Sequence, residues 1–208
     1  MEHLKGYYRF QSTIYDATRW AFLFGRTEIL DALAKAAPGA RQLVEIGCGT
    51  GHNLCGLAER FPEAQITGID LSPDMLAIAR RKTARFGGRV MLRQEIQRDI
   101  LGGGFQVVLF SYSLSMMNPG WETVLEAALA ALEPGGIVGV VDFHGSPVPW
   151  FRRHMANHHV RMEAHLLPRL RDRLKQESGA VRSAYAGLWT FFSFVGRKDD
   201  APEAGVGQ

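Results

Sequence analysis

The sequence predicts an α/β fold in which a mostly parallel sheet carries helices on both faces. Between residues 42 and 142, short apolar runs alternate with stretches of helical periodicity, a pattern typical of a parallel sheet. A Gly-x-Gly-x-Gly turn joins the first of these runs to the first helix. Two apolar runs near the end of the chain have no helix between them, so they predict an antiparallel strand pair at one edge.

The predicted elements are, in order, strand 42–46, helix 53–60, strand 65–70, helix 73–86, strand 89–93, strand 105–111, helix 121–132, strand 136–142 and strands 181–187 and 189–196. One domain over residues 1–198 accounts for them, because 208 residues that are 46% hydrophobic can bury a full core. Its predicted parts are an aromatic N-terminal helical cap (1–37), a cofactor-binding core (40–145), a basic segment that faces substrate and membrane (146–180), and edge strands (181–198). Residues 199–208 are predicted to be a disordered tail.

The glycine turn after strand 42–46 predicts a binding site for S-adenosylmethionine. Gly47, Gly49 and Gly51 let the backbone approach a ligand closely, and the following helix offers unpaired N–H groups. A dinucleotide site would need its third glycine at His52, and a phosphate-binding loop would need Lys-Ser or Lys-Thr after the glycines. The negative charge of Glu45 suits a cationic amino-acid group better than a pyrophosphate. The alternative is a tight turn with no ligand.

Asp70 supports the cofactor interpretation. It ends strand 65–70, 19 positions after Gly51, where an acid can accept hydrogen bonds from both ribose hydroxyls. Asp70 could instead cap the next helix, but Ser72 already suits that role, with Pro73 at the first helical position. We therefore expect Asp70 to bind the ribose.

Composition limits the function classes that fit this chain. Cys48 and Cys55 form neither a disulfide framework nor a CxxC pattern, so we expect reduced thiols in a cytoplasmic protein. The first residues lack an apolar signal region and no window approaches 18 uninterrupted apolar residues, which argues against secretion and a membrane span. A net charge of +3 permits an acidic partner without requiring nucleic acid.

Residues 40–145 resemble the seven-stranded, Rossmann-like class I methyltransferases. The resemblance implies that Glu95 takes the adenine amino group and that Ile96 covers the ring, although Gln94-Glu95-Ile96 replaces the usual Gly-Asp-Ala. It further implies that donor and acceptor meet at residues 110–114. Turn and resemblance together predict a cofactor site made of Tyr15, Arg19, Glu45, Gly47, Cys48, Gly49, Gly51, Asn53, Asp70, Leu71, Met75, Glu95, Ile96 and Ser111.

The end of strand 105–111 bears on the substrate. Methyltransferases that act on nucleobase amines share an Asn/Asp-Pro-Pro-aromatic turn at the end of this strand. At the same position this chain has Ser111-Tyr112-Ser113-Leu114-Ser115. Nucleic acid is therefore disfavoured as substrate.

The leader is rich in aromatic residues, with seven among residues 6–26. An amphipathic cap whose rings pack on the sheet is one interpretation. Phenols also need a polar contact, so Tyr8 and Tyr15 favour a lid that encloses a cationic amine, with Arg19 holding the donor's carboxylate.

This leader and residues 110–117 resemble the N-methyltransferase of bacterial betaine-lipid synthesis. The resemblance implies that diacylglyceryl-homoserine is methylated, three times in that family, to diacylglyceryl-trimethylhomoserine, and that the enzyme making the homoserine lipid is a functional partner. Phosphatidylethanolamine is the nearest rival substrate. The same core also fits a small-molecule O-, C- or N-methyltransferase, or a catalytically silent partner of another synthase.

Residues 147–175 carry seven Lys/Arg against two acids. Basic residues interleaved with Trp150, Phe151, Leu166, Leu167 and Leu170 predict peripheral contact with an anionic membrane surface, inside the cell. An ordinary basic surface helix is the alternative. His154, His158 and His159 lack a carboxylate or cysteine to complete a metal site, so no metal is expected.

Methyl transfer to an amine needs alignment and the loss of one proton. The predicted catalytic residues are Tyr112 at the fourth strand tip and Asp142 and His144 at the fifth, which would bind the ammonium and relay the proton. The rings of Tyr8, Tyr15 and Tyr112 would hold the trimethylated product.

Overall fold

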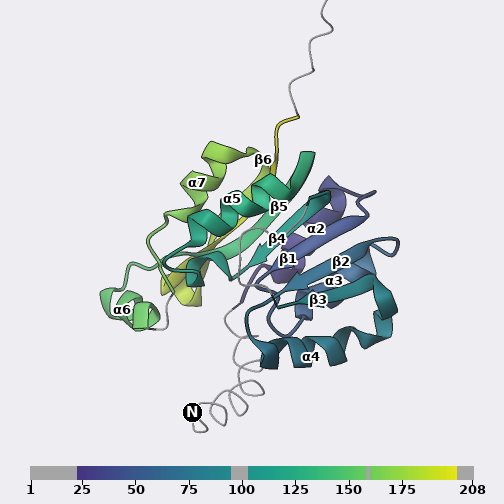
Figure 1. Cartoon of the computed structure of the whole chain (residues 1–208). Helices are drawn as coiled ribbons and strands as arrows, with labels where there is room; N and C mark the ends of the chain where they lie inside the picture. Colours follow the sequence, from purple (N-terminus) through teal and green to yellow (C-terminus); the bar gives the residue numbers. More distant parts are fainter. Residues whose placement is uncertain (1–22, 95–102, 158–159, 201–208) are drawn as a thin grey trace, which may run out of the picture.

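The computed structural model describes residues 23–94, 103–157 and 160–200 (Figure 1). Within these residues seven strands form one sheet in the order β3-β2-β1-β4-β5-β7-β6. The strands are β1 (Gln42–Ile46), β2 (Gln65–Ile69), β3 (Val90–Arg93), β4 (Phe105–Ser111), β5 (Leu132–Gly145), β6 (Lys175–Ala184) and β7 (Trp189–Arg197). Neighbours from β3 to β5 are parallel, and β7 is antiparallel to both β5 and β6. The predicted fold class is confirmed.

Helices cover both faces of this sheet. The helices α2 (Arg26–Ala36), α3 (His52–Arg60) and α4 (Pro73–Thr83) contribute to one buried cluster, and α5 (Trp121–Ala131) and α7 (Leu166–Arg173) contribute to a second. In Figure 1, α6 (Pro149–Asn157) lies to the side of the sheet at lower left. Short 3-10 turns, η1 (Ala84–Arg89), η2 (Leu114–Met116) and η3 (Tyr185–Gly187), complete the described elements.

Side-chain alternation along the strands separates the two clusters. On β4, Val107 and Leu109 face α2 and α3, whereas Val108 and Phe110 face α5 and α7. Successive side chains of a strand point to opposite faces, and helices cover both faces, so most positions of β4 are apolar. This is why residues 107–110 of β4 form a continuous apolar run.

Some element boundaries differ from the prediction. Helix α4 ends at Thr83 rather than at residue 86, and the 3-10 turn that follows contains Gly87 with a φ of 60°. Strand β6 begins at Lys175 rather than at residue 181, so residues 175–180 belong to the sheet edge and not to the basic segment. Its first residues are polar and exposed, and the apolar pattern of a strand is therefore missing there.

Several predictions fall outside the described residues. The aromatic leader up to residue 22 and most of the predicted tail, residues 201–208, are among them. None of the described helices has both the length and the apolar character needed to cross a membrane.

Candidate functional site

The glycine turn lies between β1 and α3, against the tip of β4. Gly47 and Gly51 have φ values of 79° and 77°, in the left-handed region that favours glycine. A Cβ on Gly47 would lie 2.5 Å from the Cβ of Ser113, and one on Gly51 would lie 2.9 Å from the Cβ of Ala79. Larger residues at either position would therefore displace the turn. The close approach to Ser113 also brings the turn against the predicted methyl-transfer region.

Asp70 holds the turn to the end of β2. Its Oδ2 accepts a hydrogen bond from the Gly49 N–H at 2.8 Å, and its Oδ1 accepts from the Ser72 N–H at 2.9 Å. Ser72 Oγ accepts from the Met75 N–H, with Pro73 in the first turn, so Ser72 is the cap of α4 as predicted. A carboxylate has about four acceptor positions, which leaves capacity for ribose hydroxyls.

Glu45 is buried at the end of β1, where Asn53 Nδ2 donates to its Oε1 at 2.6 Å. Arg26 Nε donates in turn to Asn53 Oδ1 at 3.1 Å. The array places a carboxylate and a guanidinium beside the glycine turn, a charge pattern that matches an ammonium and a carboxylate. Sequence reasoning missed Arg26 because the signal, an arginine directly after Gly25, is not specific.

The remaining predicted cofactor residues occupy varied environments. Cys48 is buried, and desolvation raises the pKa of its thiol well above the usual range. Leu71 is 62% exposed beside Asp70, and Met75 is half-buried on α4. The Oγ of Ser111 is buried without a hydrogen-bond partner among the described residues. The predicted Tyr8, Tyr15, Arg19, Glu95 and Ile96 lie outside those residues.

The structure gives Tyr112 a different role from the predicted one. Its side chain is 1% exposed, its ring packs edge-on against Phe143 at 4.8 Å, and its hydroxyl donates to the Phe24 carbonyl at 2.8 Å. Burial raises the pKa of the phenol, which keeps it protonated. A buried phenol that is bonded to backbone is poorly placed to relay a proton or to offer its face to a cation, so the prediction for Tyr112 needs correction.

Asp142 likewise serves the fold. It is fully buried, and its carboxylate accepts hydrogen bonds from the Ser115 N–H at 3.1 Å, the Ser115 hydroxyl at 2.5 Å and the Phe143 N–H at 2.8 Å. Burial raises its pKa to about 6, although the hydrogen bonds oppose the shift. Asp142 therefore ties η2 to β5, and because its side chain is fully buried it is poorly placed to bind the acceptor's ammonium as predicted.

His144 is the third of the predicted catalytic residues within the described part of the chain. Its Nδ1 is buried without a hydrogen-bond partner among the described residues, and its ring meets Phe192 edge-on at 6.0 Å. Desolvation, with a smaller contribution from the nearby Arg171, lowers its pKa, so the imidazole is neutral at pH 7. Phe192 and Tyr112 belong to opposite clusters, so the structure does not bring the three predicted catalytic side chains together. The role of His144 stays a prediction.

The basic segment divides into two helices with different environments. On α7, Leu166, Leu167 and Leu170 are buried against the sheet, so they form core and not a membrane-facing surface. On α6, Phe151 is buried as well, whereas Trp150 is 65% exposed. The predicted interfacial surface is thus reduced to α6.

No metal-binding group of three His, Cys, Asp or Glu side chains occurs within residues 23–94, 103–157 and 160–200. Of the three histidines considered, His158 and His159 lie outside that part of the chain.

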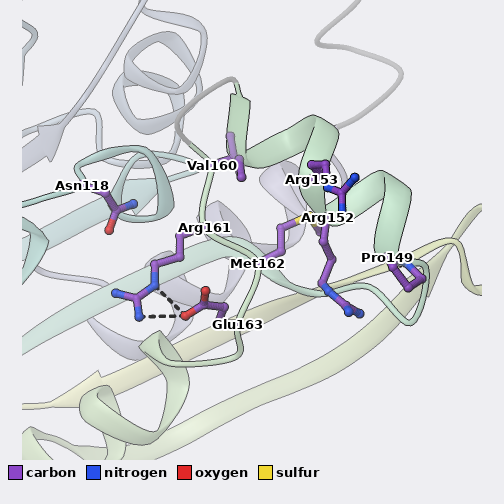
Figure 2. A pocket seen from close by; sticks show the side chains of 9 residues that line it. Asn118, Pro149, Arg152, Arg153, Val160, Arg161, Met162 and Glu163 are labelled. Atoms are coloured by element: carbon purple, nitrogen blue, oxygen red, sulfur yellow. Dashed lines mark hydrogen bonds and ion pairs between the residues drawn. The ribbon is translucent and has the colours of Figure 1, made fainter.

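A pocket of about 530 Å³ lies between α6 and the segment that follows it. Figure 2 shows Pro149, Arg152 and Arg153 of α6 on one side and Arg161 with Glu163 on the other. The pocket is also lined by Asn118, Ala156, Val160 and Met162. The composition of residues 147–175 indicated basic character, but the approach of Asn118 is a long-range contact with no local signal.

The central part of the chain matches a known protein family. Residues 44–138 match the family described as methyltransferase domain. A trans-aconitate 2-methyltransferase of Rhodopseudomonas palustris is 35% identical over 100 residues, which are 48% of this chain and 38% of that protein. The chain thus spans less than half the length of that relative.

Two solved structures share the fold over a larger part of the chain. The 1,6-didemethyltoxoflavin-N1-methyltransferase of Burkholderia thailandensis, bound to S-adenosylhomocysteine, has a TM-score of 0.69 at 19% identity and covers 92% of this chain and 86% of its own. The N-methyltransferase NodS of Bradyrhizobium japonicum has a TM-score of 0.66 at 19% identity and covers 83% and 85%. Residues 44–138 thus match a methyltransferase domain, in a chain that shares its fold with these two solved methyltransferases.

Proposed function

We propose that this protein is an S-adenosylmethionine-dependent N-methyltransferase. The observation that carries the proposal is the left-handed glycine turn, which has no room for a Cβ at Gly47 or Gly51 and lies between Glu45 and Asp70. Asp70 would bind the ribose, Glu45 the donor's ammonium, and Arg26 its carboxylate, a role predicted for Arg19. When bound, the cofactor supplies an electrophilic methyl group on a sulfonium.

The acceptor would lie over the ends of β4 and β5. Once the acceptor's ammonium has lost a proton, the neutral amine nitrogen would accept the methyl group, and the electron pair of the broken C–S bond would stay on sulfur. Deprotonating an ammonium whose pKa is about 8 to 9 costs on the order of 2 kcal/mol near pH 7, so a modest base suffices. The neutral imidazole of His144 suits that task, since its Nδ1 has no partner among the described residues.

For the acceptor we propose the amine of diacylglyceryl-homoserine, methylated up to three times to the betaine lipid. The resemblance of residues 6–26 and 110–117 to betaine-lipid N-methyltransferases supports this substrate. The exposed Trp150 and the arginines of α6 support peripheral contact with anionic headgroups on the cytoplasmic side of a membrane. The enzyme that makes the homoserine lipid would be a functional partner, and phosphatidylethanolamine remains the rival lipid.

A small carboxylic acid is a second candidate acceptor. The Rhodopseudomonas relative is named for trans-aconitate, and three arginines line the pocket beside η2. An O-methyltransferase of this kind would need no membrane contact.

Methyl transfer from labelled S-adenosylmethionine separates these candidates. The acceptors are diacylglyceryl-homoserine and phosphatidylethanolamine in mixed micelles, and trans-aconitate in solution, with products resolved by mass. We expect mono-, di- and trimethylated homoserine lipid. Transfer to trans-aconitate alone would overturn the lipid assignment, and donor binding without transfer to any acceptor would overturn the proposed substrates.

A further inference from the structure

The pocket between α6 and residues 160–163 has an excess of positive charge. Arg152, Arg153 and Arg161 line it, against the single acid Glu163 (Figure 2). Arg161 Nε and Nη2 both lie 2.7 Å from Glu163 Oε2, so these two charges balance each other. Arg152 and Arg153 therefore give the pocket lining its net positive charge.

Arg152 and Arg153 differ in their hydrogen bonding. Arg152 donates through Nη1 to the Ser146 carbonyl at 2.6 Å, which fixes its side chain and leaves its other N–H groups available. Arg153 has neither a hydrogen bond nor an ion pair within the described part of the chain. One anchored and one unpaired guanidinium provide several donors for the two or three oxygens of a carboxylate or phosphate.

Short contacts join the pocket to the predicted reaction centre. The Ser115 carbonyl accepts from the Arg161 N–H at 3.0 Å and from Asn118 Nδ2 at 2.6 Å, and the hydroxyl of the same residue bonds to Asp142. Two residues earlier, Ser113 Oγ donates to the Ile46 carbonyl at 2.8 Å, next to the glycine turn. The pocket wall and the cofactor turn are therefore parts of one hydrogen-bonded structure.

We propose that this pocket binds the anionic group of the methyl acceptor, a carboxylate or a phosphate, through Arg152 and Arg153. Arg161 is a positioning residue, held by Glu163 and by the backbone of Ser115. The inference rests on the proposed function, because it assigns a part of the same acceptor. An anion anchored here would orient an amine or hydroxyl on the same molecule towards the ends of β4 and β5.

Calorimetric titration of the full chain, saturated with S-adenosylhomocysteine, tests the pocket without requiring turnover. Homoserine carries the carboxylate and phosphoethanolamine the phosphate, while ethanolamine has the amine alone. Because the probes are soluble, membrane contact does not enter the result. We expect at least one anionic probe to bind at millimolar concentrations and ethanolamine not to bind.

The variant Arg153→Gln should weaken that binding by about tenfold or more, since hydrogen bonds to charged groups are the strong ones. Arg152→Gln should have a similar effect, and Arg153→Lys a smaller one. Arg182→Gln, which removes an exposed charge on β6, is the matched control and should bind like the original protein. Equal binding by Arg153→Gln and the control, equal binding of ethanolamine, or no binding of either anion would each overturn the proposal.

The two proposals fail separately. Anion binding that depends on Arg153, together with no methyl transfer to a lipid amine, would retain the pocket and reject the substrate. Transfer to the homoserine lipid with an unchanged KM in Arg153→Gln would retain the function and reject the pocket. Preference for homoserine or phosphoethanolamine identifies which anion the pocket selects.

Discussion

The proposed donor and acceptor sides of the site are built in different ways. On the donor side, Glu45, the glycines and Asp70 lie within one strand-helix-strand unit, and their contacts join residues 8 and 21 positions apart within it. On the acceptor side, Ser115 contacts Asp142 and Arg161, which come from distant parts of the chain. A local unit is recognisable as a motif, whereas the acceptor side becomes visible only once the sheet is assembled.

This difference also separates general from specific function. The residues that match the methyltransferase domain family, 44–138, include the donor side and end before Asp142 and α6. Acceptor recognition would thus depend on a region outside the match, where relatives with different substrates are free to differ. Variants on the two sides should therefore change different measured quantities.

The largest effect is expected on the donor side, from Asp70→Ala. This change removes the acceptors for the Gly49 and Ser72 N–H groups together with the predicted ribose contact, so donor binding should be lost, by roughly a hundredfold or more in Kd. Calorimetry with S-adenosylhomocysteine measures it. Asp74→Ala, in the first turn of α4, is the control and should bind normally. A Kd within threefold of normal for Asp70→Ala would contradict the ribose assignment.

On the acceptor side, Asp142 should make stability depend on pH. Its pKa rises from 3.8 to about 6 on folding, so between these values the folded state keeps a proton that the unfolded state has lost. Stability from this group therefore falls as pH rises through about 6, and moving from pH 7 to pH 5 should add about 1 kcal/mol.

Urea unfolding of the original protein and of Asp142→Asn at both pH values measures this contribution as a difference. The comparison is needed because the lowered pKa values of His144 and His165 act in the opposite direction. An identical pH dependence in both proteins would show that the Asp142 carboxyl does not titrate in this range.

The sequence predicted the sheet and the donor turn better than the acceptor side for a physical reason. Strand periodicity, glycine spacing and the Ser72 cap are local properties, and the structure confirms the elements that they predict. The proton-relay role expected of Tyr112 and Asp142 depends instead on what each side chain meets across the sheet. Tyr112 meets Phe24 and Asp142 meets Ser115, partners that no local pattern indicates.

Tyr112→Phe sharpens this correction with a smaller effect. The ring contact with Phe143 remains, and only the hydrogen bond to the Phe24 carbonyl is lost. We expect the free energy of unfolding to fall by about 1 kcal/mol, because one hydrogen bond is lost. The turnover number of the folded protein should stay nearly unchanged. Unfolding and initial-rate measurements on one preparation decide between the roles. A large fall in turnover with unchanged stability would restore the predicted relay.

The smallest effect is expected from Trp150→Ala, which concerns α6 alone. Because the side chain is 65% exposed, its removal should leave the unfolding midpoint and donor affinity unchanged. Binding to vesicles with anionic lipids should weaken by roughly fivefold, since burying the ring in the interface contributes about 1 kcal/mol. Val181→Ala removes an apolar residue of β6 that is 46% exposed, and it should not affect vesicle binding. Equal vesicle affinity for the two variants would show that Trp150 of α6 does not contact the membrane. The role proposed for α6 would then be anion binding alone, which would favour a soluble acceptor.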